Sequence, residues 1–128
     1  MSTATLIRSE PLADEYSRRC VTALRADVLG ALRRPNAAMT DIGARSPMRL
    51  VCATLGVPRR DWARLSRLAW QADAPSTDAL SAYVDVMIAD RCWQPADDLL
   101  ADLVMADVRG DGLTADEIRS IAVALLTS

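Results

Sequence analysis

The stretch Met48-Arg-Leu-Val-Cys-Ala-Thr-Leu-Gly-Val-Pro58 predicts a short helix with well-marked ends. Ser46-Pro47 comes directly before it and is a helix-start signal, so we expect the helix to run from Met48 to Leu55. Gly56 occupies the position where helices end in a residue of positive φ, and Pro58 cannot continue the helix. The segment therefore predicts a helical unit that begins and stops within eleven residues.

Upstream of this unit the sequence predicts a longer helix. Apolar side chains recur at helical spacing, and the predicted helix starts near Ser9 and Pro11 and stops at Arg33-Arg34-Pro35-Asn36. Residues 1–10 show no such period and are expected to form a tail. The residues that carry the period are Leu12, Tyr16, Cys20, Leu24 and Val28. Between the two helices, Ala37 to Gly43 predicts a short strand.

Downstream, the same reasoning predicts four more helices. They cover residues 59–71, 80–92, 97–104 and 114–126, with a break at Ala74-Pro75-Ser76 and a turn at Gly110-Asp111-Gly112. Thr114 and Glu117 form a capping box that opens the last helix. The fold class is therefore mainly α, with about six helices and at most one or two short strands, in one domain over residues 11–128.

The composition excludes several kinds of chemistry. The 128 residues are 51% hydrophobic and 25% charged, which is typical of a globular domain. All 15 basic residues are Arg, so the absence of His and Lys removes imidazole catalysis, His metal ligands and Schiff-base chemistry. The net charge of −2 argues against nucleic acid or an anionic membrane surface as a partner. The longest apolar run, Ile121 to Leu126, is too short to cross a bilayer, and we expect a soluble cytoplasmic protein.

Three cysteines, Cys20, Cys52 and Cys92, are too far apart in the sequence to form a Cys-x-x-Cys metal or redox pair. Cys52 and Cys92 lie on apolar faces of their predicted helices, so we expect buried, unreactive thiols. Trp62, Trp70 and Trp93 are expected to anchor the core or helix interfaces rather than to stack on bases.

Three further patterns have structural explanations that we favour over functional ones. Asp107 to Gly112 resembles the start of a calcium loop, but Arg109 and Ile118 occupy two positions that need oxygen ligands, so we expect a polar turn. Glu15 and Arg18 are spaced as a surface ion pair on a helix. The remaining group is a carboxylate cluster that suits the start of a helix better than acid–base catalysis: Asp97, Asp98 and Asp102.

Three segments, taken in order, resemble bacterial cytochromes P450. They are Met48 to Pro58 followed by Arg59-Arg-Asp-Trp62, then Asp97-Asp-Leu-Leu-Ala-Asp-Leu-Val104, and then Gly110 to Leu126. Their order and spacing are similar to those of the family, and the resemblance covers roughly residues 12–128. It implies that the predicted helices correspond to the family's D to H helices and the first turns of its I helix. The family function is heme-thiolate monooxygenation of an apolar small molecule, with electrons from a redox partner.

The resemblance also implies which functional positions this sequence lacks. The chain has no Phe for the family's heme-ligand loop, and none of its cysteines stands in that context. Thr127 and Ser128 fall at the edge of the family's Ala-Gly-x-x-Thr oxygen-site segment. No catalytic, cofactor-binding or metal-binding residue can therefore be carried over. We expect no cofactor on this chain, although heme iron and a redox partner are implied for the full-length family.

The last predicted helix stops in mid-pattern, which suggests a truncated P450-like domain that is inactive alone. Two alternatives remain: a non-enzymatic helical interaction module, and one half of a split P450. The apolar residues of this helix surround most of its circumference, so the sequence predicts self-association through them: Ile118, Ile121, Ala122, Val123, Leu125 and Leu126.

Overall fold

The computed structural model describes the backbone of residues 2–32, 39–108 and 111–128, and the side chains of residues 17–32, 39–106 and 112–128. Within these ranges the chain is mainly α-helical, as predicted, with seven α-helices, one 3₁₀ turn and one pair of two-residue strands. The elements are α1 (Ser2–Ala31), α2 (Met39–Ala44), α3 (Met48–Leu55), η1 (Arg59–Asp61), α4 (Trp62–Gln71), α5 (Ala74–Trp93), α6 (Leu99–Val104), β1 (Asp107–Val108), β2 (Asp111–Gly112) and α7 (Ala115–Leu126).

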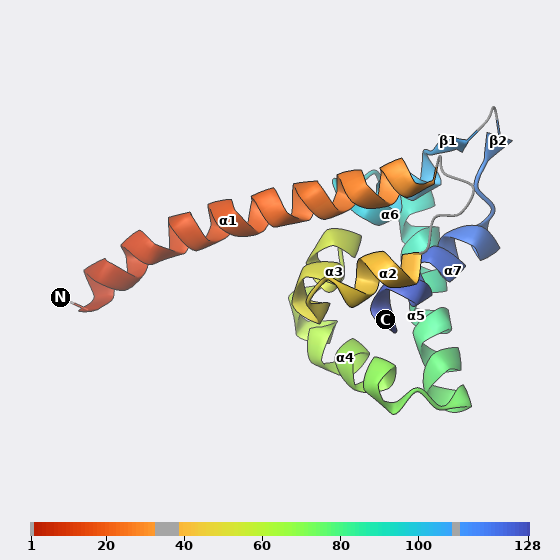
Figure 1. Ribbon diagram of the computed structural model, residues 1–128, viewed down its shortest axis with the longest axis horizontal. Coiled ribbons are helices and arrows are strands. Elements are labelled where there is room, and N and C mark those ends of the chain that lie inside the picture. The colour runs from red at the N-terminus through yellow and green to blue at the C-terminus, as the bar shows by residue number, and fades with distance from the viewer. Residues whose placement is uncertain (1, 33–38, 109–110) are drawn as a thin grey trace.

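The core forms around α7, which contacts α2, α3, α4, α5 and α6 (Figure 1). The side chains of Ile118, Ala122, Leu125 and Leu126 are buried there, at most 3% exposed. The expectation that this helix leaves a wide apolar surface uncovered is therefore wrong, because the chain's own helices cover most of it. Only part of that surface, including Ile121 and Val123, remains half-buried.

Backbone signals in the sequence place most helix ends correctly. Gly56 follows α3 with φ of 91°, and the Thr114–Glu117 capping box opens α7 with both of its hydrogen bonds present. At the start of α5, however, the predicted break at Ala74-Pro75-Ser76 is wrong. Asp73 caps the helix by accepting from the Ser76 N–H at 2.7 Å, and Pro75 lies in the first turn, where its missing N–H costs nothing.

Two other predictions upstream are wrong. The first helix begins at Ser2 rather than near Ser9, and its early part projects beyond the body of the molecule (Figure 1). A helical stretch that projects in this way needs no apolar stripe, so the sequence there shows no helical period. The segment expected to be a strand contains α2 instead, because burying Ile42 and Gly43 against α7 favours a helix. Ala37, Ala38 and the predicted stop at residues 33–36 lie outside the described residues.

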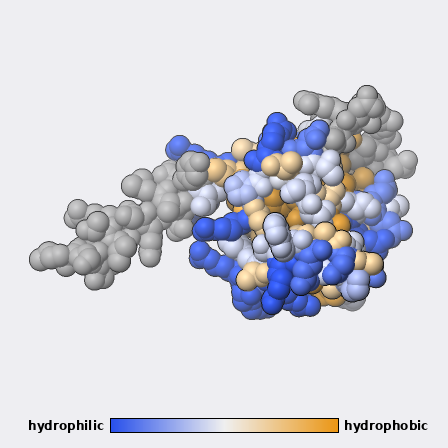
Figure 2. Space-filling model, turned by 60° about the horizontal axis from the view of Figure 1, so that its bottom comes forward, coloured by the Kyte–Doolittle hydropathy of each residue, from blue (hydrophilic) through white to orange (hydrophobic). Residues whose placement is uncertain are grey.

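The strand pair joins Asp107–Val108 to Asp111–Gly112 in antiparallel register, with Asp107 opposite Gly112. On the face shown in Figure 2, hydrophilic side chains cover most of the surface and hydrophobic atoms show mainly in the gaps between them. Among the described residues, no helix combines the length and the hydrophobicity that crossing a membrane requires.

Candidate functional site

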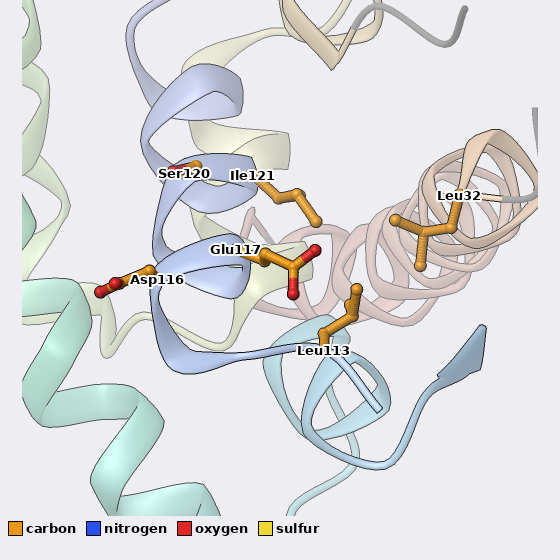
Figure 3. Close-up of a pocket in the computed structure, with 6 residues that line it drawn as sticks. All are labelled: Leu32, Leu113, Asp116, Glu117, Ser120 and Ile121. Atoms are coloured by element: carbon orange, nitrogen blue, oxygen red, sulfur yellow. The ribbon is translucent and has the colours of Figure 1, made fainter. Parts of the chain in front are cut away.

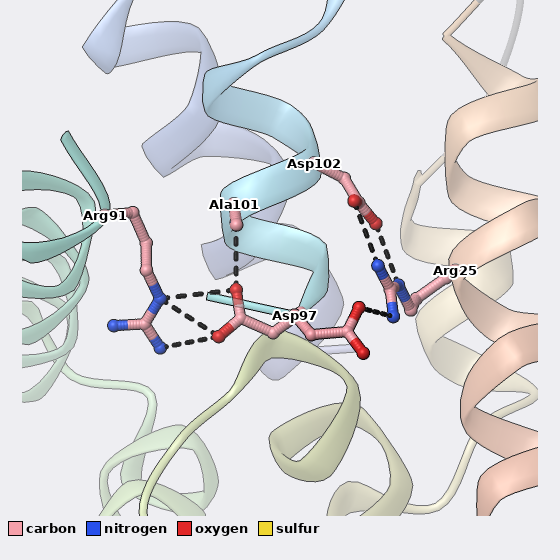
Figure 4. A network of polar contacts seen from close by, with 6 residues as sticks. Arg25, Arg91, Asp97, Ala101 and Asp102 are labelled. Carbon is pink, nitrogen blue, oxygen red and sulfur yellow. Dashed lines mark hydrogen bonds and ion pairs between the residues drawn. The ribbon is translucent and has the colours of Figure 1, made fainter. Parts of the chain in front are cut away.

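A network of two arginines and three aspartates joins α1, α3, α5 and α6 (Figure 4). Arg25 of α1 donates from Nε to Asp102 Oδ2 at 2.8 Å and from Nη1 to Asp97 Oδ1 at 3.0 Å. The hydrogen bond to Asp102 is the largest influence on the Arg25 guanidinium, whose pKa is raised. This half of the network attaches α1 to the start of α6.

Asp98 holds the other half of the network together. It is the N-cap of α6 and accepts from the Ala101 N–H at 2.9 Å, while Arg91 Nη2 lies 2.8 Å from its Oδ2. The same Arg91 Nη2 donates to the Gly56 carbonyl oxygen at 3.1 Å. The ion pair is almost dry, with 14% of the Arg91 side chain and 10% of the Asp98 side chain exposed.

The structure thus brings together the three carboxylates that the sequence singled out. It confirms the helix-start role for Asp98, the N-cap, and Asp102, in the first turn, whereas Asp97 lies before the cap because α6 begins at Leu99. Asp97 and Asp102 are both engaged by Arg25, and Asp98 by Arg91 and the α6 backbone. A general acid or base needs a carboxylate that can reach a substrate proton. Asp98 and Asp102 are held in ion pairs and Asp97 keeps 95% of its side chain exposed, so the arrangement shown by these contacts is a link between helices.

A groove of about 460 Å³ lies between the end of α1 and the start of α7 (Figure 3). Leu32, Leu113 and Ile121 face one another across it, and the Glu117 side chain points into the same space (Figure 3). Glu117 accepts from the Thr114 N–H at 2.9 Å, which lowers the pKa of its carboxyl. The groove has room for an apolar side chain. The Glu117 carboxylate that points into it is part of the α7 cap.

The tryptophans and cysteines differ from the predictions in part. Trp62 is half-buried and donates to the Val57 carbonyl oxygen at 2.8 Å, so it is the expected anchor. Trp70 and Trp93 are each 88% exposed, and Cys92 is exposed as well, so their predicted burial is wrong. Cys92 lies four positions after the buried Ile88, so the apolar period of α5 continues to it beyond the covered part of the helix. Trp70 and Trp93 each lie five positions after a buried residue, Leu65 and Ile88, and so stand on another face of their helix. Cys52 is fully buried, as predicted.

The remaining predicted motifs show no functional arrangement among the described residues. Arg18 is exposed, and the side chain of its expected partner Glu15 lies outside the described residues. Asp111 and Gly112 form β2 rather than a turn, while Arg109 and Gly110 are not described. Among the side chains that the structure describes, no group of three His, Cys, Asp or Glu residues could hold a metal ion.

Two polar contacts were not anticipated from the sequence. The Tyr83 hydroxyl donates to Asp61 Oδ2 at 2.6 Å, across 22 positions of the chain, and Arg119 Nη1 lies 3.2 Å from Asp85 Oδ2. Burial, followed by the contact with Asp61, raises the pKa of Tyr83. Neither pair is adjacent in sequence, so no local spacing could have indicated it.

The sequence and the fold are both similar to parts of larger bacterial proteins. The mycinamicin IV hydroxylase/epoxidase of Micromonospora griseorubida is 29% identical over 114 residues, which cover 80% of this chain and 28% of that protein. A mutant of the mixed-function P450 MycG, solved with mycinamicin V, has a TM-score of 0.61 at 27% identity and covers 89% of this chain. The open form of P450 EryK from S. erythraea has a TM-score of 0.57 at 25% identity and covers 85%. No family model matches the chain.

These similarities confirm the predicted resemblance to part of a cytochrome P450. The chain spans about a third of the P450 fold: 32% of the MycG structure and 34% of the EryK structure. Its mainly α architecture is thus a partial P450-like fold.

The described residues do not fit the heme group that this likeness implies. A heme-thiolate centre needs a cysteine thiolate beside a cavity for the macrocycle. Cys52 is buried in the core, and burial raises the pKa of its thiol to about 11, so it stays protonated at neutral pH. Cys20 is half-buried on α1, and Cys92 lines only an open hollow of about 300 Å³ beside the ion-paired Arg91 and Asp102.

Proposed function

We propose that this chain is a P450-like helical segment that does not carry out heme-thiolate monooxygenation on its own. The observation that supports this most directly is the placement of the cysteines. The Cys52 thiol is sealed in the core with a raised pKa, and Cys92 stands on the surface. Without a thiolate ligand, a P450-type iron centre cannot activate oxygen.

The family activity would then belong to a polypeptide that includes the remaining two-thirds of the fold. In such a protein, heme-thiolate chemistry would insert one oxygen atom into an apolar small molecule, with two electrons from a redox partner. The present chain would contribute helices that pack around the site. One relative is named as a mycinamicin IV hydroxylase/epoxidase, and these helices alone do not define a substrate.

Reconstitution with hemin tests the proposal. The purified chain is mixed with hemin, reduced and exposed to carbon monoxide, and its absorption spectrum is compared with that of an intact bacterial P450. We expect no thiolate-type Soret band from this chain. Cys92→Ser is the matched control, because its thiol is the most accessible of the described cysteines and is the one most able to bind hemin adventitiously.

A thiolate-type band that survives in Cys92→Ser and disappears in Cys52→Ser or Cys20→Ser would refute the proposal. A weak band that Cys92→Ser abolishes would assign the signal to surface binding and leave the chain without a built site. Circular dichroism of each variant shows whether its helices are retained.

A non-enzymatic helical interaction module is the second candidate, and the burial of α7 favours it. The chain's own helices cover Ile118, Ala122 and Leu125, so the segment can present a folded surface without further P450 elements. The chain matches 28% of the mycinamicin IV hydroxylase/epoxidase. Co-expression of the chain with the unmatched remainder of that protein separates this candidate from the split-enzyme alternative. A carbon monoxide band that appears only in the co-expressed pair supports a split enzyme, and its absence supports a module.

A further inference from the structure

The outer face of η1 and α4 carries a row of exposed arginines. Arg60, Arg64 and Arg67 follow one another at helical spacing, and Trp70 continues the row with 88% of its surface exposed. Residues 59–72 contain four arginines and one carboxylate, Asp61. This face is therefore locally basic although the whole chain has a net charge of −2. We call Arg60, Arg64, Arg67 and Trp70 the arginine row.

The far end of α5 carries a second exposed patch with the opposite charge. Trp93 is 88% exposed and Met105 is 81% exposed, and both line the same hollow of about 300 Å³. Asp90 and Asp102 stand around Trp93, and 95% of the Asp97 side chain is exposed nearby. We call Asp90, Trp93, Asp97, Asp102 and Met105 the acidic patch.

The charges of the acidic patch are only partly compensated. Arg25 pairs with Asp97 and Asp102, and Arg91 pairs with Asp98. Together with Asp90, four carboxylates therefore stand near two arginines. Neither Trp93 nor Met105 gains burial within the chain. An apolar centre with an excess of carboxylates around it suits a partner surface that presents an aromatic or aliphatic side chain among arginines.

The arginine row has that chemistry, and it lies beside the first half of α5. Arg64 lies over the Tyr83 ring at 6.0 Å, and Asp61, next to Arg60, accepts from the Tyr83 hydroxyl. Trp93 comes ten positions after Tyr83, roughly 15 Å further along α5, so the row and the acidic patch are separate surfaces of one molecule. They can meet between two copies.

We propose that the chain associates head to tail with a second copy, the arginine row of one copy docking on the acidic patch of the other. Such a contact joins two different surfaces, so each copy keeps one free end and longer chains can grow. The contact depends on charge and on two exposed tryptophans, and it does not depend on whether the chain binds heme.

Sedimentation at several protein concentrations tests the proposal. We expect the average mass to rise with concentration at about 0.05 M salt and to fall toward the monomer at about 0.5 M, where charges are screened within a few ångströms. Two blocked variants sharpen the test: R64E/R67E at the arginine row and D90R/M105S at the acidic patch. Each alone should weaken association at least about tenfold.

A mixture of the two blocked variants gives the decisive result, because each keeps one intact surface. The mixture should form dimers and no larger species, while R18E/R49E, which makes the same charge change on exposed arginines elsewhere, should associate like the parent chain. A parent chain that stays monomeric, or association that neither block weakens, overturns the proposal. Binding of a monomeric chain to phosphatidylserine vesicles or to duplex DNA through Arg64 and Arg67 would also overturn it, by giving the row another partner.

Discussion

Gly56 is the residue at which α3 ends and the Arg91–Asp98 pair approaches the backbone. Its φ of 91° lies in the left-handed region, and a Cβ at this position would overlap the Asp98 carboxylate and lie 2.8 Å from Arg91 Nη2. The positive φ was predictable from the Leu55-Gly56-Val57-Pro58 order. The close approach of Asp98 was not, because it comes from a residue 42 positions later in the chain.

Gly56→Ala should therefore lower the free energy of unfolding by about 2 to 3 kcal/mol, since backbone strain adds to the displacement of a nearly buried ion pair. Urea denaturation followed by circular dichroism measures the loss. Gly30→Ala is the matched control: nothing lies within 4 Å of its Cβ position in α1, so it should leave stability unchanged or raise it by up to about 1 kcal/mol. Equal stability of Gly56→Ala and the parent would show that the helix end is misplaced.

The buried Cys52 thiol predicts a loss of stability at alkaline pH. Burial raises its pKa from 9.0 to about 11, so the unfolded thiol loses its proton before the folded one does. The free energy of unfolding should be constant below pH 9.0 and fall by about 2 kcal/mol as the pH approaches 11. The pKa of Tyr83 is raised too, so the measurement uses a Tyr83→Phe background. Adding Cys52→Ala should flatten the pH dependence, and an unchanged slope would contradict the assignment.

At the scale of elements, Asp98 connects α6 to α5 and α3. Asp98→Ala removes the α6 cap and leaves Arg91 without its carboxylate in a nearly dry position, so we expect a loss of about 3 kcal/mol in the free energy of unfolding. Asp97→Ala, one residue away, should change stability little, because 95% of that side chain is exposed and Arg25 keeps Asp102. Similar losses in both variants would show that Asp98 has no special position.

The helix boundaries that the sequence predicted correctly are those with local causes. Gly56, Pro58 and the Thr114–Glu117 box act within one turn of their own helix, so residue type alone reveals them. Some of the wrong predictions concern packing between distant segments, whereas the break at Ala74-Pro75-Ser76 missed a local cap by Asp73. α2 is a helix because Ile42 and Gly43 pack against α7, and a Cβ on Gly43 would lie 2.8 Å from the Leu125 carbonyl oxygen.

The candidate site follows the same division. The aspartates at the start of α6 were predictable as helix-start residues, whereas their arginine partners come from α1 and α5. The apolar period of α5 predicted a buried Cys92, but a helical period cannot tell where the neighbouring helices stop. The exposure of Trp70 and Trp93 has another cause: each lies five positions, about 140° around the helix, from a buried residue, so the spacing itself indicates an exposed face.

For the whole molecule, the central feature is that a third of a P450-like fold closes a core of its own around α7. The sequence predicted self-association through this helix because its apolar residues surround it. Most of that apolar surface is buried within the chain, as shown by four residues of α7: Ile118, Ala122, Leu125 and Leu126. Association through the remaining half-buried residues stays a prediction, and it is distinct from the charge-dependent contact between the arginine row and the acidic patch.

Native-state hydrogen exchange of the α7 amides tests the closed core most directly, because an amide exchanges slowly only where its helix is protected by packing. We predict slow exchange from Ile118 to Leu126, with opening free energies close to that of global unfolding and unchanged on dilution to the monomer. Fast exchange across these residues in the monomer, with α5 still protected, would show that α7 is not covered by its own chain and would contradict the account.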